Sequence, residues 1–396
     1  MYSINKMTSL VCKDHLNKLI NKYEKRQDKH IVQISKGVIK VVKQFIKDNN
    51  LILYGGTALN ELLPSSNKIY PIHKLADYDV YSNDALNHAK ELSNILADKG
   101  YKYIEMRQAA LTDNTFKIFV ENIPACDISN ISKNEYTQLL NTAVKRNGIL
   151  ISSPEYLLKS LTFELSHPHM SYFRWDKLID RYEIFNKIHG IHKYNLDFDT
   201  TIPNSKHELV LNNILSFCKK YGYPLLGNCA LQLHQKQKNI RYEKYHSEMS
   251  YLQVITINSN ILIDFCVKNF KCSLTKHDNY TTLSLDNINI LDVFIAKDVC
   301  ISTCERIGYK ILTMFGIQYF LYQMLLNNKN NYIKYMIYKS NQILKEYKCS
   351  KECMIGIECY GDGKPIAWNI RKMRWNTGII KYRPKLIENK NKSIVR

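Results

Sequence analysis

Three aspartates in the first third of the sequence have the spacing of metal ligands. Asp77 and Asp79 are separated by one residue in a strand-like segment, so their side chains project from the same face. Two carboxylates at such a short distance repel each other unless a cation compensates their charge. Asp127, between Cys126 and Ile128, offers a third carboxylate from another strand-like segment. Carboxylate oxygens are preferred ligands of Mg²⁺, and three such groups can hold two Mg²⁺ or Mn²⁺ ions.

Such a site supports attack of a hydroxyl group on a phosphorus atom. One ion activates the attacking hydroxyl, and the other neutralises the pyrophosphate that leaves. We expect Asp127 to assist the activation through metal rather than as a free base. Catalysis of this kind depends mostly on positioning and on charge neutralisation.

A glycine turn upstream supplies the complementary half of a nucleotide site. The apolar run 51–54 ends at Gly55, Gly56 and Thr57, and helical spacing follows until Pro64. Glycines let backbone N–H groups approach a triphosphate closely, and the amino end of a helix favours negative charge. The turn is not a P-loop, because no Gly-Lys-Ser/Thr follows it.

These residues need a scaffold of helices and strands. Helical periodicity predicts helices over residues 8–48, 85–99, 153–163 and 175–189, and short apolar runs predict strands at 51–54, 77–81, 101–106, 116–120 and 125–128. The predicted fold class is therefore mixed α+β. Lys159, on the third helix, is a further candidate for contact with a triphosphate, although lysines on exposed helix faces are common.

The second half of the chain repeats this pattern weakly. A helix over 206–221 leads to PLLGNCALQL at 224–233, which is similar to LILYGGTAL at 51–59, and ILIDF at 261–265 resembles the segment around Asp127. A duplicated module whose second copy lost its metal ligands explains the pattern. Coincidental similarity is the alternative. Asp264 lacks acidic partners in the sequence, so we expect it to be structural.

Breaks in periodicity and the repeat divide the chain into four predicted segments. These are an N-terminal helical segment (1–50), the domain that carries the aspartates (51–197), its degenerate copy (198–300), and a helical, basic C-terminal region (301–396).

The chain is strongly basic. It has 56 Lys+Arg against 36 Asp+Glu, which gives a formal net charge of +20. Such a surplus favours association with polyanions. A codon bias towards Lys, Asn, Ile and Tyr is the alternative explanation.

The C-terminal end concentrates this charge and interleaves it with aromatic residues. An RNA strand can stack on such aromatics while the cations contact its phosphates. The RNA-binding candidates are Arg371, Lys372, Arg374, Trp375, Lys381 and Arg383, with Tyr382 among them. A solvated terminal tail is the alternative.

The 11 cysteines are scattered, and no secretory pattern opens the chain. A reducing compartment with free thiols is the natural inference. The pairs Cys300/Cys304 and Cys349/Cys353 have the spacing of one helical face, where thiolates can bind zinc. Zinc usually occupies tighter knuckles and buried free cysteine is common, so unliganded thiols are favoured over a metal site.

Two other features are expected to be structural. His167 and His169 flank Pro168, and a turn with solvated imidazoles is favoured over metal binding. No apolar stretch reaches about 18 residues, which argues against a membrane span. The longest candidate, 311–326, is interpreted as a buried helix.

The ordered set of motifs resembles the DNA polymerase β-like nucleotidyltransferase superfamily. More closely, it resembles the poly(A) polymerase catalytic subunits of large DNA viruses, of the giant amoebal virus and poxvirus type. The resemblance rests on YGGTALNELLP at 54–64 and DYDVYS at 77–82, and it is extended by SPEYLLK at 153–159, FELS at 163–166 and FRWDK at 173–177.

This resemblance implies a template-independent enzyme that transfers AMP from ATP to the 3′-hydroxyl of mRNA. It implies that Asp77, Asp79 and Asp127 bind metal and that the glycine turn contacts ATP. It also implies tandem nucleotidyltransferase-like domains with the second inactive, and either a homodimer or a separate processivity subunit. The implied localisation is the virion and the host cytoplasm, in a viral factory.

Two alternatives stay open at this level. One is a nucleotidyltransferase with another acceptor, such as tRNA, a protein or a second nucleotide. The other is a non-catalytic RNA-binding subunit, which is disfavoured because all three carboxylates are present.

Overall fold

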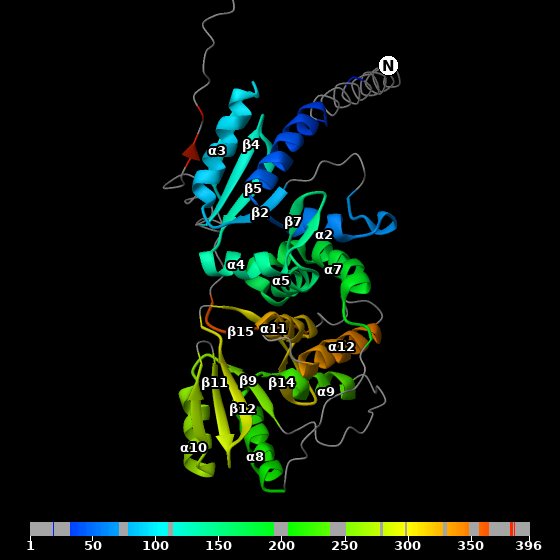
Figure 1. Cartoon of the computed structure of the whole chain (residues 1–396). Helices are drawn as coiled ribbons and strands as arrows, with labels where there is room; N and C mark the ends of the chain where they lie inside the picture. The colour runs from blue at the N-terminus through cyan, green and yellow to red at the C-terminus, as the bar shows by residue number, and fades with distance from the viewer. Residues whose placement is uncertain are drawn as a thin grey trace, which may run out of the picture. The chain divides into compact units, whose positions relative to one another are not determined.

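The chain forms two compact units, residues 1–153 with 368–396 and residues 154–367, drawn in the computed structural model of Figure 1. The structure describes residues 19, 32–70, 78–109, 114–193, 205–237, 251–277, 280–297, 299–327, 331–347, 356–363, 381–382 and 384. The division places residues 301–367 with the second module and returns the C-terminal segment to the first unit.

The first unit is built on an eight-stranded mixed sheet in the order β16-β3-β4-β5-β2-β1-β7-β6. Its strands are β1 (Ile52–Tyr54), β2 (Tyr78–Ser82), β3 (Ile104–Gln108), β4 (Thr115–Val120), β5 (Ile123–Asn130), β6 (Val144–Arg146), β7 (Ile149–Ile151) and β16 (Lys381–Tyr382). Its helices are one over residues 32–48, α2 (Gly55–Leu62), the short 3₁₀ helix η1 (Ser65–Asn67), α3 (Ala85–Asp98) and α4 (Lys133–Thr142).

The second unit is built on another eight-stranded sheet, in the order β10-β11-β12-β9-β8-β14-β13-β15. Its strands are β8 (Leu225–Leu226), β9 (Leu252–Thr256), β10 (Ser273–Lys276), β11 (Tyr280–Leu285), β12 (Ile288–Ile295), β13 (Ile301–Arg306), β14 (Tyr309–Leu312) and β15 (Glu358–Tyr360). Its helices are α5 (Pro154–Ser166), α6 (Pro168–Ser171), η2 (Tyr172–Arg174), α7 (Trp175–His189), α8 (Ser205–Tyr221), α9 (Gly227–Gln237), α10 (Asn260–Phe270), α11 (Met314–Asn327) and α12 (Asn331–Lys345).

The two sheets have one topology, which is the physical basis of the sequence repeat. Strands β3-β4-β5-β2-β1-β7-β6 correspond in order to β10-β11-β12-β9-β8-β14-β13. The pairs β2–β5 and β1–β7 are parallel, as are β9–β12 and β8–β14. The hairpins β4–β5 and β11–β12 each contain a register shift and turn through two residues with positive φ. The duplication is therefore more than a local similarity around the glycines.

Most predicted elements occur close to their predicted positions, because their apolar periodicity matches their burial. In the helix over 32–48, the buried apolar side chains are Val38, Val42, Phe45 and Ile46, which fall on one face among lysines. The buried helix expected at 311–326 is α11, which has a nearly continuous apolar surface.

The expectation that the chain is mostly helical after residue 301 is wrong in part. A β13–β14 hairpin precedes α11, and Cys304 lies on β13 rather than on a helix. The β-branched residues Ile301 and Thr303 favour the strand here. Cys300 and Cys304 therefore share no helical face, and Cys349 and Cys353 lie outside the described residues.

The core of the second unit includes a polar cluster between three helices. The Tyr182 hydroxyl, on α7, donates a hydrogen bond to Gln318 Oε1 on α11. The Gln318 amide in turn donates to Ser340 Oγ and to Asn341 Oδ1 on α12, over 3.0 and 2.9 Å. Buried polar groups that satisfy each other in this way fix the relative position of their helices.

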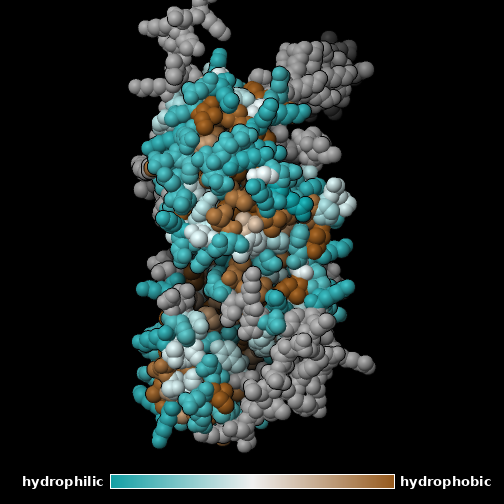
Figure 2. Space-filling model, in the orientation of Figure 1, coloured by the Kyte–Doolittle hydropathy of each residue, from teal (hydrophilic) through white to brown (hydrophobic). Residues whose placement is uncertain are grey.

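Hydrophilic side chains cover most of the described surface on the face shown in Figure 2, and hydrophobic ones occur in scattered patches. The most exposed large hydrophobic side chains are those of Tyr103, Tyr172 and Leu209, at 79%, 65% and 65%. Among the described helices, none is long and apolar enough to span a membrane.

Candidate active site

The turn between β1 and α2 is closed against an aspartate of the neighbouring strand. Gly55 has φ +69°, and a Cβ atom at this position would lie 2.4 Å from Oδ2 of Asp79. Only glycine fits both the backbone conformation and the close approach. Gly56 and Thr57 follow in the first turn of α2, and the Thr57 side chain is buried. The turn therefore brings the amino end of a helix beside a carboxylate.

Two of the predicted metal ligands are neighbours on adjacent parallel strands. Asp79 on β2 is in register with Asp127 on β5. Parallel strands lie about 4.8 Å apart, and paired residues project from the same face. Asp127 is only 6% exposed, whereas Asp79 is half-buried. Asp77 lies just before β2 and outside the described residues, so its place in the site stays a prediction.

A lysine that the sequence interpretation missed compensates this negative charge. Lys117 on β4 is paired in register with Asp127 and forms an ion pair with its Oδ2. The signal was available in the sequence, because Lys117 alternates with the buried apolar residues Phe116 and Ile118 and must project from the opposite face. A positively charged side chain is thus present where the two carboxylates converge.

A tyrosine at the end of β1 borders the same site. The Tyr54 hydroxyl lies 2.7 Å from Ser129 Oγ, which lies 2.8 Å from Thr115 Oγ1. The Tyr54 ring stacks on Tyr81, with ring centroids 3.9 Å apart. Burial, followed by the negative charge of Asp79, raises the pKa of Tyr54 far above its usual value. Tyr54 therefore stays neutral and acts as a rigid side of the site.

Lys159, the other predicted nucleotide ligand, lies on α5 in the second unit. Its ammonium is 4.9 Å from the centroid of the Tyr156 ring. Contact between Lys159 and a triphosphate stays a prediction.

The predicted RNA-binding residues fall almost entirely outside the described residues. These are Arg371, Lys372, Arg374, Trp375 and Arg383. The exception is Lys381, whose backbone lies in β16 opposite Arg107 of β3. The adjacent Tyr382 hydroxyl donates a 2.6 Å hydrogen bond to Asn94 Oδ1. Residues 381–382 are therefore an edge strand of the first sheet rather than part of a solvated tail.

The second module preserves the geometry of this site with different chemistry. Gly227 has φ +66°, and a Cβ atom there would lie 2.2 Å from Oε1 of Gln253. Gln253 on β9 is in register with Asp292 on β12. Gln253 therefore occupies the position of Asp79, and Asp292 that of Asp127.

The predicted correspondence of Asp264 with Asp127 is wrong. Asp264 is exposed on α10, the counterpart of α3, because the run ILIDFCV continues as a helix rather than a strand. The sequence interpretation missed Asp292, whose neighbours Leu291 and Val293 are both fully buried like those of Asp127.

Asp292 is held by hydroxyl groups instead of a cation. The Tyr251 hydroxyl donates to its Oδ2, and Thr282 Oγ1 donates to its Oδ1 over 2.7 Å. Tyr251 precedes Gln253 by two residues, as Asp77 precedes Asp79. Burial raises the pKa of Asp292 to about 7. In the second module, the positions that correspond to Asp77 and Asp79 carry no carboxylate, so this module lacks the ligands for a two-metal site.

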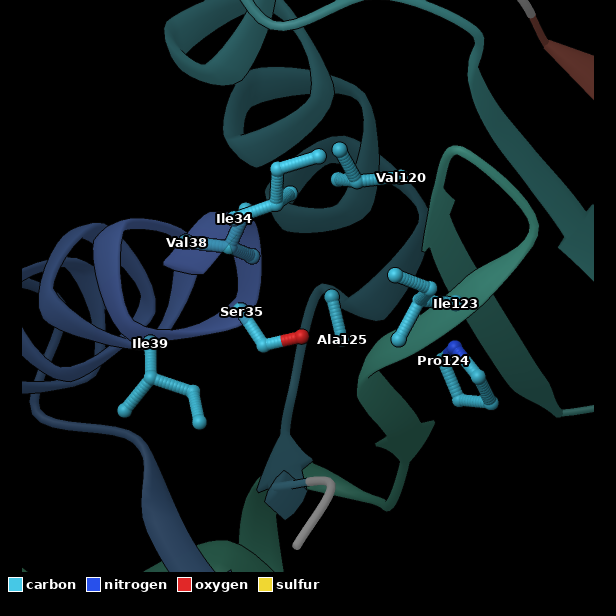
Figure 3. Close-up of a pocket in the computed structure, with 8 residues that line it drawn as sticks. All are labelled: Ile34, Ser35, Val38, Ile39, Val120, Ile123, Pro124 and Ala125. Atoms are coloured by element: carbon cyan, nitrogen blue, oxygen red, sulfur yellow. The ribbon is translucent and has the colours of Figure 1, made fainter. Parts of the chain in front are cut away.

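A separate cavity borders β4 and β5 but does not suit a nucleotide. It is lined by Ile34, Ser35, Val38, Ile39, Val120, Ile123, Pro124 and Ala125 (Figure 3). Its volume is about 30 Å³, enough for roughly one water molecule. This cavity is a packing gap beneath the helix over 32–48.

A strand, a glycine turn and a helix occur in both units, and in the first unit two carboxylates on neighbouring strands complete an arrangement that is typical of nucleotidyltransferases. Residues 40–171 match the poly(A) polymerase catalytic subunit family. The predicted resemblance to viral poly(A) polymerase catalytic subunits is thereby confirmed.

Individual viral proteins agree with this family match. A protein of Acanthamoeba polyphaga mimivirus, named as a candidate poly(A) polymerase catalytic subunit, is 27% identical over 183 residues, which cover 45% of this chain and 31% of that protein. An African swine fever virus protein with the same name is 26% identical over 182 residues, which cover 43% and 38%. The match spans about a third of the length of these relatives.

The fold extends well beyond the matched sequence. The crystal structure of the Megavirus polyadenylate synthase superposes with a TM-score of 0.72 at 20% identity, over 94% of this chain and 86% of that one. The mixed α/β fold predicted from the sequence is confirmed along most of the chain.

The closed β1–α2 turn generates the first prediction. Gly55→Ala should lower the thermal midpoint of unfolding, with a cost of about 1–3 kcal/mol for a side chain at positive φ plus the collision with Asp79. Gly100→Ala is the matched control, because Gly100 has φ +84° with open space around it. Equal losses in the two variants would show that the contact with Asp79 contributes nothing.

The ion pair of Lys117 generates a second prediction. In the presence of a chelator, Lys117→Met should unfold at a lower temperature than the wild type, because Asp79 and Asp127 lose a positive charge. Mg²⁺ or Mn²⁺ should then raise the melting temperature of the variant more than that of the wild type. Lys145→Met, at an exposed position of β6, is the control. The idea fails if both variants respond to metal like the wild type.

The buried carboxyl of Asp292 generates a third prediction. Its folded-state pKa of about 7 lies above its usual value of 3.8, so the folded state keeps a proton that the unfolded chain has lost between these pH values. This contribution to stability is complete below about pH 4, falls as the pH rises to about 7, and is absent above it.

Asp292→Asn should remove this dependence and unfold at a higher temperature than the wild type at pH 8, with a gain on the order of 2 kcal/mol. Denaturation between about pH 4 and about pH 8 measures it, because this interval covers both pKa values. Asp264→Asn, at an exposed position, should leave the wild-type pH profile intact. Parallel profiles for the wild type and Asp292→Asn would contradict the assignment.

Proposed function

We propose that this chain is a template-independent poly(A) polymerase, which transfers AMP from ATP to the 3′-hydroxyl of RNA and releases pyrophosphate. The observation that carries the proposal is the register of Asp79 with Asp127 beside the Gly55 turn. The family match over residues 40–171 supports adenylyl transfer over other reactions of the superfamily.

The residues present fit a divalent cation. Asp79 and Asp127 present hard oxygen ligands from adjacent strands, and Lys117 marks the point where positive charge is needed. Asp79 and Asp127, together with Asp77, would hold Mg²⁺ or Mn²⁺. When bound, such ions lower the pKa of the attacking hydroxyl and neutralise charge on the leaving pyrophosphate.

The protein groups around the carboxylates have separate tasks in this proposal. Backbone N–H groups at Gly55, Gly56 and Thr57 receive the triphosphate at the amino end of α2. Tyr54, fixed by Ser129 and stacked on Tyr81, keeps one side of the site rigid. Lys159, on α5, is retained as a sequence-based candidate for contact with the triphosphate. Positioning by these groups keeps the RNA hydroxyl in line with the α-phosphate.

The macromolecular context is part of the same proposal. The RNA path includes the basic segment of residues 371–383, the end of which pairs with β3 as β16. The active form is a homodimer or pairs with a processivity subunit, and the protein acts in the virion and in cytoplasmic viral factories.

Primer extension tests the reaction. A labelled RNA primer is incubated with each of the four nucleoside triphosphates and Mg²⁺ or Mn²⁺. The wild type should add A residues selectively, and Asp79→Asn and Asp127→Asn should each lower the rate about 100-fold or more, as expected when an electrostatic contact to the transition state is removed. Asp98→Asn, at the exposed end of α3, should retain the wild-type rate.

The failures of this experiment are informative. Unselective extension would move the assignment to a nucleotidyltransferase with another acceptor. RNA binding without extension under either metal would identify a non-catalytic RNA-binding subunit.

A further inference from the structure

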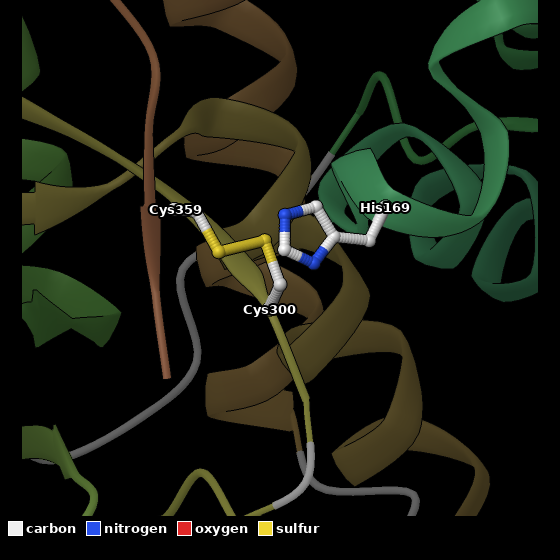
Figure 4. Close-up of side chains that lie close together, drawn as sticks. All are labelled: His169, Cys300 and Cys359. Carbon is white, nitrogen blue, oxygen red and sulfur yellow. A yellow bond between two sulfur atoms is a disulfide. The ribbon is translucent and has the colours of Figure 1, made fainter. Parts of the chain in front are cut away.

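The second unit contains a cluster of soft metal ligands that has no part in the proposed reaction. A ring nitrogen of His169 and the Sγ atoms of Cys300 and Cys359 all lie within 4.8 Å of one another (Figure 4). The two sulfur atoms are joined as a disulfide in this structure. The sequence favoured unliganded thiols for Cys300 and Cys304 and a solvated turn for His169. The fold instead brings His169 and Cys300 together with Cys359.

Strand pairing places the two cysteines on one face of the sheet. β13 and β15 are antiparallel, with Ser302 opposite Cys359. Cys300 shares the face of Ser302, so it is the diagonal neighbour of Cys359, and the Cα atoms of the cysteines are 5.4 Å apart. The pair is therefore set by backbone register, not by the sulfur–sulfur bond.

Two glycines hold the segment after β15 close to the start of β13. The Gly363 N–H donates a 2.9 Å hydrogen bond to the Val299 carbonyl. A Cβ atom at Gly361 would lie 2.1 Å from the Val299 oxygen, and one at Gly363 would lie 2.4 Å from the Val299 carbonyl carbon. No side chain fits at either position, so the two glycines are required for the close contact of this segment with the Val299 backbone.

The imidazole of His169 is oriented as a ligand. Its Nδ1 lies 3.1 Å from the Gly363 carbonyl oxygen. A carbonyl only accepts hydrogen bonds, so in the neutral imidazole Nδ1 is the protonated nitrogen and Nε2 is the one with a free lone pair. Figure 4 shows the ring turned towards the sulfur atoms. Histidines that bind metals usually donate their other N–H to a carbonyl or carboxylate in this way.

We propose that, in the reduced protein, Cys300, Cys359 and His169 form a zinc site. Two thiolates and one imidazole suit Zn²⁺ better than a hard cation. On binding, the two thiols release two protons to solvent, no electrons are transferred, and the fourth position is taken by water. Cys300 is buried, His169 is half-buried and Cys359 is exposed, so the site opens to solvent on one side.

The other described cysteines favour this assignment. Cys126, Cys218, Cys229, Cys266, Cys272 and Cys304 are all buried free thiols. A compartment that keeps thiols reduced also presents Cys300 and Cys359 as thiols. Zinc then cross-links α6, which carries His169, to β15 and to Cys300 just before β13, whereas a disulfide joins the two cysteines alone.

Metal content tests the proposal directly. The full chain is purified in a phosphine reductant without chelator, and zinc is measured by mass spectrometry. The wild type should hold about one zinc per chain, and Cys359→Ser and His169→Gln should each lose most of it. Cys304→Ser is the matched control, a buried thiol of the same strand outside the cluster, and it should keep its zinc.

If the variants fail to fold, a spectroscopic measurement on the wild type tests the same proposal. Cobalt(II) added to the reduced, metal-free wild type should give thiolate-to-metal charge-transfer absorption, which zinc abolishes and His169→Gln weakens. The proposal is overturned if the reduced wild type binds no stoichiometric zinc and gives no such absorption. It is equally overturned if peptide mapping of protein from a reducing cytoplasm finds the Cys300–Cys359 disulfide throughout.

Discussion

The convergence of Asp79 and Asp127 is the constraint on which the first unit depends. Parallel pairing of β2 with β5 fixes the two carboxylates side by side, and their electrostatic repulsion must be compensated within the structure. Lys117 on β4 supplies a positive charge beside Asp127, and Gly55 leaves room for the Asp79 carboxylate. Much of the sheet order, with β1 and β4 flanking β2 and β5, serves to bring these compensating groups to one place.

The second unit has the same strand order and glycine turn as the first, but it lacks the pair of charged aspartates. Gln253 replaces Asp79 against Gly227, and Tyr251 supplies a hydroxyl to the one remaining carboxylate, Asp292. Thr282 stands opposite Asp292, where the first unit has Lys117 opposite Asp127. With Tyr251 and Gln253 at these positions, neither sets a second carboxylate beside Asp292, and Gly227 is still required because its turn closes on the long side chain of Gln253. A duplicated scaffold can therefore keep its geometry after its chemistry has gone.

Local sequence signals predicted the parts of the fold and site that depend on local physics. Gly55 was found from the strand-to-helix transition, and Asp79 from its period-two spacing. Such signals failed where a short apolar run is compatible with two kinds of secondary structure. The run ILIDF around Asp264 is as typical of a strand as of a helix, and only tertiary packing makes it part of the helix α10. Cys359 could not be found in this way, because its contact with Cys300 depends on strand pairing across a sequence separation of 59 residues. For Lys117, local alternation gave the face of the strand but not the partner, Asp127.

The strand β16 has a consequence for how the molecule is made. Residues 381–382 pair with β3, although the whole of residues 154–367 lies between them and the rest of the first unit in the chain. On the ribosome, the second unit emerges complete and can fold while the first still lacks its edge strand. The sheet that carries Asp79 and Asp127 therefore cannot be completed until residue 382 has been made, and a nascent chain that stops short of this residue leaves the backbone edge of β3 unpaired at Met106 and Arg107.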